Sequence, residues 1–558
     1  MKRISILLST FLAIGLFASA QIAPDKYYVQ FTDKDNSPYS LGNPLEYLSQ
    51  RSVDRRTTFN IPIDMKDIPV NPQYLQGVKD AGASIINPTK WLNGVTIYTT
   101  DAFVVAAIEA LPYVQSIAKS PVKPGNTEVE KTFFANESYG VAPASGTTMK
   151  SVSEYDYGPS YSQISMLKGD QMHELGYTGK GIIIAVLDAG YNNADELPVF
   201  DSLWDNGQIL GTRDFVDGGE ITFNKHYHGT MVLSTMGGNY PGEIVGTAPD
   251  AYYYLLRTED GSSELIIEEY NWVSGAEYAD SLGAYVLNTS LGYSDFPDDP
   301  SQNHTYEDMD GNTTPITIGA DVAASRGMVV VNSAGNSGSS AWYYITAPAD
   351  GDSVFTIGAV NSQGVPASFS SHGPTYDDRI KPNVAAQGEG AYFAKPDGTF
   401  IYGNGTSFSS PIIAGMMACL WQANPDMSNM DLVNAVQASG SLADNPDNTI
   451  GYGIPDFMAA HNILTVIEND DEIVFTRMNL FPNPFTSYFV LNVSSEVNAG
   501  ARMVVVDMTG RTVFENDYLI SQGMNNIRVT ALDNIPAGIY FLRLESGSSV
   551  ITTKLISQ

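Results

Sequence analysis

The chain has 558 residues, 43% of them hydrophobic, so it exceeds one ordinary domain and can bury at least one large core. Its 62 acidic residues outnumber 29 basic ones, and the resulting formal charge of -33 argues against binding to nucleic acid or to anionic membrane surfaces. The single cysteine, Cys419, excludes an internal disulfide and a cysteine-based zinc cage.

The first 20 residues have the pattern of a secretory signal peptide. Lys2 and Arg3 precede an apolar segment, which ends in the small residues Ala18-Ser19-Ala20. A membrane anchor is the alternative, but this apolar core is short and ends in a cleavage-type sequence. No other uninterrupted run of about 20 apolar residues follows. We therefore predict a signal peptide at residues 1–20 and an exported mature chain without a transmembrane segment.

Residues 21–120 alternate short strand patterns such as YYVQF with helical patterns such as PQYLQGVKDAG. This alternation predicts a small α+β unit with its own core. Residues 121–160 are mostly polar and rich in Ser, Thr, Gly and Glu. We interpret them as a mobile connector.

Residues 161–466 contain strand patterns that are almost continuously apolar, namely GIIIAVL, AYYYLLR, AYVLNTS, GMVVVNSA and SVFTIGAV. Helix-like segments such as ELIIEEYNWVSGAEYADSLG separate them. Apolar strands of this kind are typical of a parallel sheet covered on both faces. The pattern predicts a three-layer α/β domain with a mostly parallel sheet.

Residues 478–558 have a different texture. Short alternating strands such as YFVLNVSS and AGIYFLRLES follow one another, with Gly, Asn and Pro at the turns and no helical period. This pattern predicts a small β-sandwich.

Polar residues follow several of the predicted parallel strands. In open α/β sheets, active sites lie at this edge, outside the carboxyl ends of the strands. Asp188 ends one strand, Ser290 follows a second and Asn336 follows a third. His228 and Ser407 precede apolar runs that predict helices, and a helix N-terminus favours developing negative charge. Taken singly, Asp188 is more often a turn or cap residue, His228 a surface or core histidine and Ser407 a helix cap.

Together, these residues supply the roles that acyl transfer needs. Asp188, His228 and Ser407 occur in that order, and Asn336 can donate to an oxyanion. An α/β-hydrolase needs a G-x-S-x-G elbow, whereas GTSFS lacks the second glycine. A zincin needs H-E-x-x-H, and the six histidines are not so placed. The constellation therefore favours serine-based acyl transfer.

At this point the sequence resembles the subtilisin-like serine peptidases, or subtilases. The three main blocks are AVLDAGY around Asp188, HYHGTMV around His228 and NGTSFSSP around Ser407. Supporting blocks VGTAPDAYYYLLR, LNTSLG and VVVNSAGNSG lie between them in the expected order. The likeness covers residues 160 to 466 and implies a subtilisin-like fold.

The resemblance implies a role for each matching residue. Asp188 orients the imidazole, His228 acts as general base and acid, and Ser407 attacks the scissile carbonyl. Asn336 donates its side-chain amide to the oxyanion, with the backbone N–H of Ser407 as second donor. All four are present, so the resemblance implies an active enzyme.

The resemblance also assigns substrate-binding segments. Ser290-Leu291-Gly292 and Ser333-Ala334-Gly335 would pair with the substrate backbone and wall the pocket for the residue before the cut. The serine block departs from the family at Phe408, Ser409 and Ile412, which replace Met, Ala and His. These changes leave the catalytic atoms intact but put the shape of the pocket in doubt.

Residues 21–120 resemble the inhibitory propeptide of subtilases, which docks on the catalytic domain and whose C-terminal segment fills the active site until it is cut. The resemblance makes this propeptide a partner of the catalytic domain. It also implies that the connector, residues 121–160, contains the processing site. The residues do not indicate which bond is cut.

Residues 478–558 resemble the C-terminal sorting domain of the type IX secretion system, through Pro482-Asn483-Pro484, MTGRTV, GMNNIRV and AGIYFLRL. A plain accessory β-domain is the alternative. The resemblance implies export through the periplasm to the medium or the cell surface, with the type IX secretion machinery as partner.

The loop from Glu307 to Asn312 is rich in carboxylates, and Asp308, Asp310 and Asn312 are candidate ligands for a structural calcium ion. Gly311 is in the wrong place for an EF-hand loop, and a solvated Asx turn is an equal alternative. We expect no other cofactor.

The leading hypothesis is a secreted serine endopeptidase that cleaves polypeptides through a Ser-His-Asp triad and an acyl-enzyme. A catalytically silent surface binding protein that retains the fold is the alternative from another class. An esterase would share the chemistry and differ only in substrate.

Overall fold

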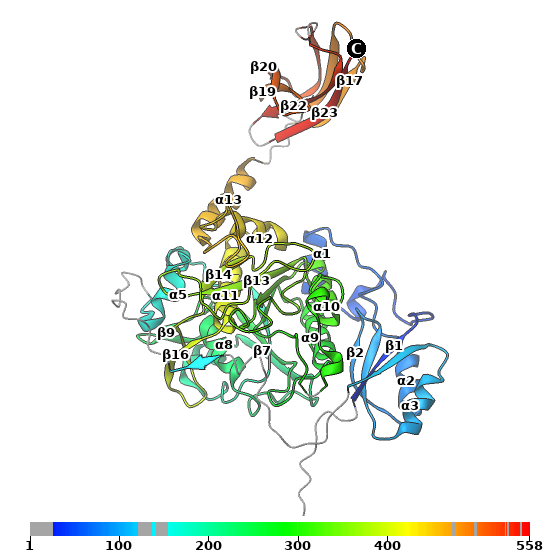
Figure 1. Ribbon diagram of the computed structural model, residues 1–558, viewed down its shortest axis with the longest axis vertical. Coiled ribbons are helices and arrows are strands. Elements are labelled where there is room, and N and C mark those ends of the chain that lie inside the picture. Colours follow the sequence, from blue (N-terminus) through cyan, green and yellow to red (C-terminus); the bar gives the residue numbers. More distant parts are fainter. Residues whose placement is uncertain are drawn as a thin grey trace, which may run out of the picture.

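The computed structural model describes residues 26–120, 137–140, 155–297, 299–470, 475–495, 499–530, 532, 535–546 and 549–558. They form an N-terminal α+β unit, a central α/β unit and a C-terminal β unit (Figure 1). The predicted signal peptide at 1–20 lies outside the described residues, as does most of the connector at 121–160. Within these ranges, no helix is both long and apolar enough to cross a membrane.

The N-terminal unit is an antiparallel sheet in the order β2-β3-β1-β4, with its own apolar core. Helices α2 and α3 lie against one face, and Val29, Val78 and Ile108 are fully buried in that core. The predicted α+β unit is thereby confirmed. Its elements are β1 (Lys26–Phe31), α1 (Gln50–Thr58), α2 (Pro72–Asp80), β2 (Ser84–Thr89), β3 (Gly94–Tyr98), α3 (Ala102–Glu109) and β4 (Val114–Lys119).

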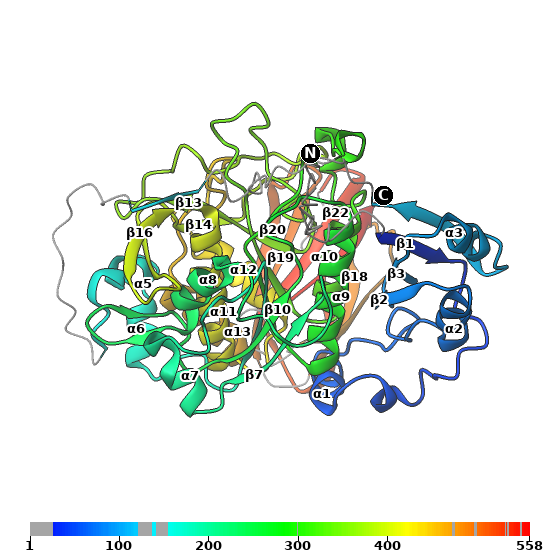
Figure 2. The same ribbon diagram turned by 90° about the horizontal axis from the view of Figure 1, so that it is seen from below.

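This unit docks on helix α9 (Ile267–Leu282) of the central unit, with the sheet between α9 and the helices α2 and α3 (Figure 2). Arg55 and Arg56 of α1 form ion pairs with Asp280 of α9 at 2.6 and 2.9 Å. All three side chains are buried, and buried charges are tolerated only when they are paired. Tyr28 stacks on Tyr270 at 3.8 Å between ring centroids. The interface is thus specific in both charge and shape.

The central unit is a seven-stranded sheet in the order β14-β13-β12-β11-β6-β10-β7, and all of its pairings are parallel. Alternate residues of β6 face opposite layers: Ile184 and Val186 pack toward α8 and α11, whereas Ala185 and Leu187 pack toward α9 and α10. The predicted three-layer α/β fold is confirmed. The strands are β6 (Ile183–Asp188), β7 (Ile209–Asp214), β10 (Tyr252–Arg257), β11 (Val286–Thr289), β12 (Val329–Ser333), β13 (Val354–Val360) and β14 (Val384–Gln387).

Helices flank both faces of this sheet (Figure 1). Those that carry or adjoin the site are α8 (His228–Gly237), α9, α10 (Pro315–Ser325) and α11 (Thr406–Ala423). The remaining elements are α5 (Tyr161–Ser165), α6 (Gly169–Glu174), α7 (Asp201–Asp205), β8 (Asn239–Tyr240), β9 (Ile244–Val245), α12 (Asn429–Ala438) and α13 (Phe457–Asp470), together with short 3-10 turns.

A small antiparallel sheet lies beside the helix α11. It is formed by β15 (Ala391–Ala394), β16 (Phe400–Asn404) and β5 (Ser138–Tyr139) in the order β15-β16-β5. Strand β5 belongs to the predicted connector, so the expectation of a mobile segment is wrong for residues 137–140. These residues are held because β5 pairs with β16.

The C-terminal unit consists of two antiparallel sheets, in the orders β17-β18-β21 and β20-β19-β22-β23. They share one core, which includes Leu491 from the first sheet and Met503 and Leu542 from the second. This confirms the predicted β-sandwich. The strands are β17 (Phe475–Phe481), β18 (Phe489–Ser495), β19 (Ala499–Asp507), β20 (Thr512–Ile520), β21 (Gly523–Val529), β22 (Gly538–Ser546) and β23 (Ser549–Ser557).

Candidate active site

The candidate residues gather at the carboxyl edge of the parallel sheet. Asp188 is the last residue of β6, which lies next to β11, and β11 lies next to β12. Ser290 follows β11 directly, and Asn336 follows the end of β12. Because carboxyl ends of neighbouring parallel strands share one edge, these positions are brought together by the topology alone.

His228 is the first residue of α8, and its imidazole faces Asp188. The Nδ1 atom lies 2.9 Å from Oδ1 and 3.0 Å from Oδ2 of Asp188. Gly229 allows the start of α8 to lie this close to the end of β6. A Cβ on Gly229 would lie 2.5 Å from the backbone carbonyl oxygen of Gly190, two residues after Asp188. The carboxylate therefore holds the imidazole with Nδ1 protonated and Nε2 directed away.

Ser407 lies in the first turn of α11. Pro411, four residues later, has no N–H to donate to the Ser407 carbonyl, so that carbonyl accepts a hydrogen bond from the Ser290 Oγ at 3.0 Å instead. The Ser407 Oγ donates to the Ser290 carbonyl at 3.4 Å. These two contacts fix the start of α11 against the end of β11.

Asn336 is oriented by Thr406, the residue before Ser407. Its Oδ1 accepts hydrogen bonds from both the backbone N–H and the hydroxyl of Thr406, each at 2.9 Å. The Nδ2 atom is therefore turned away from Thr406, and it is buried with no hydrogen-bond partner among the described residues. An unpaired buried donor costs about 1–3 kcal/mol, so this amide is available to an incoming acceptor. The sequence interpretation assigned no role to Thr406.

Glu137 is a residue of the site that the sequence interpretation missed. Its side chain is fully buried, and its Oε1 lies 3.3 Å from the Nε2 of His228. The hydroxyl of Tyr139 donates to its other oxygen at 2.6 Å. Glu137 stands in a polar connector without a motif, and its contact with His228 arises only from the folded chain.

Two carboxylates therefore flank the imidazole of His228. Burial alone would lower the pKa of His228, but the charges of Asp188 and Glu137 and their hydrogen bonds outweigh burial and raise it from 6.5 to about 10. In this state the imidazole is an imidazolium at neutral pH. It can accept a proton from Ser407 only after the Glu137 carboxylate moves off Nε2 and the imidazolium gives up its extra proton to solvent.

This arrangement predicts a pH dependence for the uncleaved protein. Because the pKa of His228 is raised above 6.5, the contact stabilises the folded state fully below about pH 6.5, and this stabilisation is lost as the pH rises through about 10. An NMR titration of the histidine side chains in the S407A full chain measures the pKa directly. We expect His228 to be protonated at pH 8 and E137Q to lower its pKa. Titration of His228 near pH 6.5 in the S407A chain would contradict the contact.

The two predicted substrate-binding segments lie side by side. Both Asn332 Nδ2 and Ser333 Oγ donate to the Leu291 carbonyl, at 3.3 and 3.4 Å. The N–H of Gly335 donates to the Thr406 hydroxyl at 3.2 Å, which links this segment to the start of α11. Substrate binding by Ser290-Leu291-Gly292 and Ser333-Ala334-Gly335 remains a prediction.

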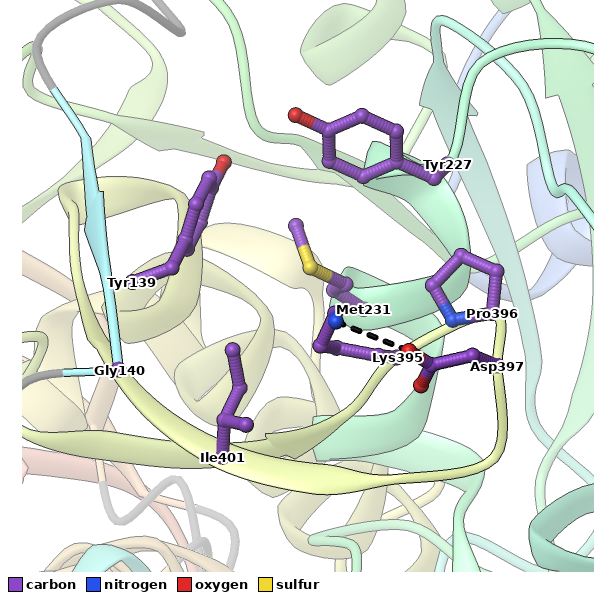
Figure 3. A pocket seen from close by; sticks show the side chains of 8 residues that line it. All are labelled: Tyr139, Gly140, Tyr227, Met231, Lys395, Pro396, Asp397 and Ile401. Carbon is purple, nitrogen blue, oxygen red and sulfur yellow. Dashed lines mark hydrogen bonds and ion pairs between the residues drawn. The ribbon is translucent and has the colours of Figure 1, made fainter.

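A cavity of about 510 Å³ opens next to β5, between the start of α8 and the β15–β16 hairpin (Figure 3). Its walls are largely aromatic or aliphatic, and an ion pair between Lys395 and Asp397 borders it. Such a cavity suits an apolar side chain of a bound polypeptide. The lining residues are Tyr139, Gly140, Tyr227, Met231, Lys395, Pro396, Asp397 and Ile401.

Phe408, an unusual neighbour for the serine, packs beneath this region. Its ring stacks on Phe393 of β15 with 4.0 Å between centroids, and both belong to a small core with Met231 of α8. Phe408 therefore brings α8, α11 and the β15–β16 hairpin into one apolar cluster.

The acidic loop before α10 uses its carboxylates locally. Asp308 Oδ2 accepts from the N–H and hydroxyl of Thr305, and Asp310 accepts from the Asn312 N–H and the Thr313 hydroxyl. The bond from the Asn312 N–H to Asp310 is that of an Asx turn, the alternative to a calcium site in this loop. Within the described part of the chain, no group of three His, Cys, Asp or Glu residues could hold a metal ion. Calcium binding at Asp308, Asp310 and Asn312 stays a prediction.

Three family models match this chain. The subtilase family model matches residues 179–453, the Bacteroidota propeptide domain of peptidase family S8 matches residues 26–133, and the secretion-system C-terminal sorting domain matches residues 479–558.

The similar curated proteins match about half of this chain. Subtilisin BL of Lederbergia lenta is 30% identical over 298 residues, which are 53% of this chain and 97% of that protein. Subtilisin E of Bacillus subtilis (strain 168) is 31% identical over 296 residues, 52% of this chain and 68% of that protein. The crystal structure of MycP1 without its N-terminal propeptide has a TM-score of 0.43 and 25% identity, covering 54% of this chain and 96% of its own.

Proposed function

Since this chain belongs to the subtilase family of serine endopeptidases, we propose that it cleaves polypeptides through an acyl-enzyme formed on Ser407. Asp188 and His228 are proposed as the other members of the triad. Asn336 and the backbone N–H of Ser407 are proposed as the oxyanion donors. The C-terminal sorting domain marks the protein for export, to secretion or cell-surface attachment, and we infer that the type IX secretion machinery is its partner.

The observation that carries this proposal is the buried, unpartnered Nδ2 of Asn336 within the described residues. Thr406 holds the amide by its oxygen, which leaves Nδ2 free for another acceptor, and we infer that this donor serves the space beside Ser407. A silent binding protein gains nothing from an orphaned buried donor, whereas an acyl-transfer enzyme needs a preorganised donor for the charge of its transition state.

In the proposed reaction, the substrate carbonyl sits between the Ser407 Oγ and the Asn336 Nδ2. His228 Nε2 takes the hydroxyl proton while Nδ1–H stays on Asp188, which stabilises the imidazolium. The bond from Oγ to the carbonyl carbon forms, and His228 returns the proton to the leaving amine. Water then repeats the steps on the acyl-enzyme. Side chains make every proton transfer, so the chemistry needs no cofactor.

We propose that polypeptides bind as added strands on Ser290-Leu291-Gly292 and Ser333-Ala334-Gly335. Backbone hydrogen bonds of this kind recognise an extended chain with little dependence on its sequence. The N-terminal unit, which docks on α9, is proposed to act as the inhibitory propeptide.

Replacement of Asn336 by alanine should lower kcat by about 10² to 10³, the loss measured in subtilisin when one oxyanion donor is removed. KM for a peptide anilide should change little, because the donor acts on the transition state more than on the bound substrate. The matched control is Asn404→Ala, which removes another asparagine amide, one whose Nδ2 donates to the Ser138 hydroxyl at 3.0 Å. Equal kcat values for N336A and wild type would contradict the assignment.

The acyl-enzyme is tested by measuring how the acyl group is divided between water and an added amine. An ester and an anilide that share one acyl group are hydrolysed in the presence of a fixed concentration of an amine acceptor. A common intermediate predicts the same ratio of hydrolysis to aminolysis from both substrates. Different ratios would show that water attacks the substrate directly, and the proposed mechanism would fall.

A further inference from the structure

The connector residues 137–140 lie in the site as an added strand. Tyr139 pairs with Gly403 and Ser138 with Asn404 in antiparallel register. The Asn404 Nδ2 also donates to the Ser138 hydroxyl at 3.0 Å. Strand β16 leads through Gly405 into Ser407, so the strand it binds lies directly beside the proposed nucleophile.

The direction of pairing shows which end of this segment is nearest to Ser407. Because the strands are antiparallel, lower-numbered connector residues pair with higher-numbered residues of β16. The next pair in this register is Glu137 with Gly405, and a Cβ on Gly405 would indeed lie 2.9 to 3.1 Å from Glu137 side-chain atoms. Of residues 137–140, Glu137 is therefore nearest to Ser407, and the peptide bond on its amino side comes next along the chain.

The contact with His228 shows on which side of the cut Glu137 lies. In serine-based acyl transfer, Nε2 of the imidazole delivers the proton to the leaving amine. That nitrogen faces Glu137 at 3.3 Å. Together with the register, which puts the bond on the amino side of Glu137 next to Ser407, this side-chain contact indicates that Glu137 is the first residue after the cut.

We propose that Ser407 cuts its own chain on the amino side of Glu137, between residues 136 and 137, so that Glu137 becomes the mature N-terminus. This inference rests on the proposed function. The match to the family propeptide ends at residue 133, shortly before this bond.

Before the cut, the Glu137 carboxylate turns away from Nε2 and the imidazolium releases its extra proton to solvent, so that Nε2 can act as the base. The Ser407 Oγ forms a bond to the carbonyl carbon of Asn136, and the bond from that carbon to the Glu137 nitrogen breaks. The hydroxyl proton passes through His228 to the new amine of Glu137. Water then hydrolyses the ester, which releases Asn136 with a free carboxylate and restores the Ser407 hydroxyl.

The same segment indicates what the leaving side of the cleft accepts. Tyr139, the third residue after the proposed cut, lies edge-on to Tyr227 and Phe393 at 6.4 and 6.3 Å between centroids. Figure 3 shows its ring at the rim of the 510 Å³ cavity. An aromatic residue at this third position therefore fits the aromatic wall.

The bond is identified by following maturation of the full chain in vitro. N336A slows the reaction, so its precursor can be purified and sampled over time by intact mass and N-terminal sequencing. The first products expected are a chain that begins at Glu137 and a fragment that ends at Asn136. The S407A precursor, purified and incubated in the same way, should stay intact.

The outcomes separate this inference from the proposed function. If the matured protein hydrolyses peptides but its first new N-terminus lies elsewhere, the inference fails and the proposed function stands. If the wild-type precursor neither matures nor hydrolyses peptides, both fail. If S407A alone still yields a chain beginning at Glu137, self-cleavage is overturned.

A proline at the proposed bond can be compared with a control proline elsewhere in the connector. Proline at position 137 removes the amide N–H at the proposed bond and fixes the backbone there. E137P should therefore lose the product that begins at residue 137, whereas T147P, further along the same connector, should give it at the wild-type rate. An E137P chain that still gains residue 137 as its N-terminus would refute the proposed bond.

Discussion

Replacement of Ser407 by alanine should lower kcat for peptide hydrolysis by about 10⁶-fold, the loss measured in subtilisin when the nucleophile of the triad is removed. The reason is that no other group can form the covalent intermediate, and His228 and Asp188 cannot act without a hydroxyl to deprotonate. Steady-state kinetics with a peptide anilide on the mature wild-type and variant proteins give the ratio.

The matched control is S409A. Ser409 is a buried serine two residues further along α11, and its hydroxyl donates to the Thr406 carbonyl at 3.1 Å. Its loss should leave kcat of the same order as in the wild type. If S409A is as inactive as S407A while both fold, the loss reflects damage to the helix start, and the nucleophile assignment is wrong.

Replacement of Asp188 by asparagine should lower kcat by about 10⁴-fold with little change in the fold. Asp188 accepts the Nδ1–H of His228 and the N–H of Ala189. An amide NH₂ facing Nδ1 favours the opposite imidazole tautomer, whose Nε2 carries a proton and cannot take one from Ser407. The measurement is kcat alongside the thermal unfolding midpoint.

Asp214 provides the comparison for this variant, because it also ends a strand of the same sheet but pairs with Arg257 at 2.8 Å. D214N should lose stability because it breaks a buried ion pair, and it should keep kcat of the wild-type order. A D188N enzyme with kcat equal to that of D214N would contradict the orienting role of Asp188.

The predictable parts of the fold are those that bury long apolar runs. Strands β6, β12 and β13 are fully buried and read as continuous apolar sequence. Strand β7 was not recognised, because it lies at the sheet edge and most of its residues are only partly buried. Strand β14 has the sequence VAAQ, in which only one residue is β-branched, so it lacks the apolar run that marks the other buried strands.

Some residues of the candidate site could be predicted from local sequence, and others could not. Asp188, His228 and Ser407 stand at strand ends or helix starts, and local sequence marks such positions. The orientation of Asn336 depends on Thr406, which is 70 positions away, and the block at His228 depends on Glu137, which is 91 positions away. Contacts between such distant positions are created by the folded chain, so a single sequence does not reveal them.

Two features of the structure are expected to keep the uncleaved protein inactive. Asp188 and Glu137 together raise the pKa of His228, and the docked N-terminal unit is fixed to α9 by buried ion pairs. We therefore expect hydrolysis of other polypeptides only after the connector leaves the site. A single cut beside Glu137 would free its strand from the rest of the N-terminal unit.

Labelling with a fluorophosphonate tests the central claim most directly, because the reagent forms a covalent adduct only with an activated serine. The mature wild-type protein is treated with the probe, digested and mapped by mass spectrometry. The account predicts a single adduct on Ser407, which is lost when the protein is unfolded before treatment. A folded protein that hydrolyses peptides while Ser407 stays unlabelled, or that carries the adduct on another serine, would contradict it.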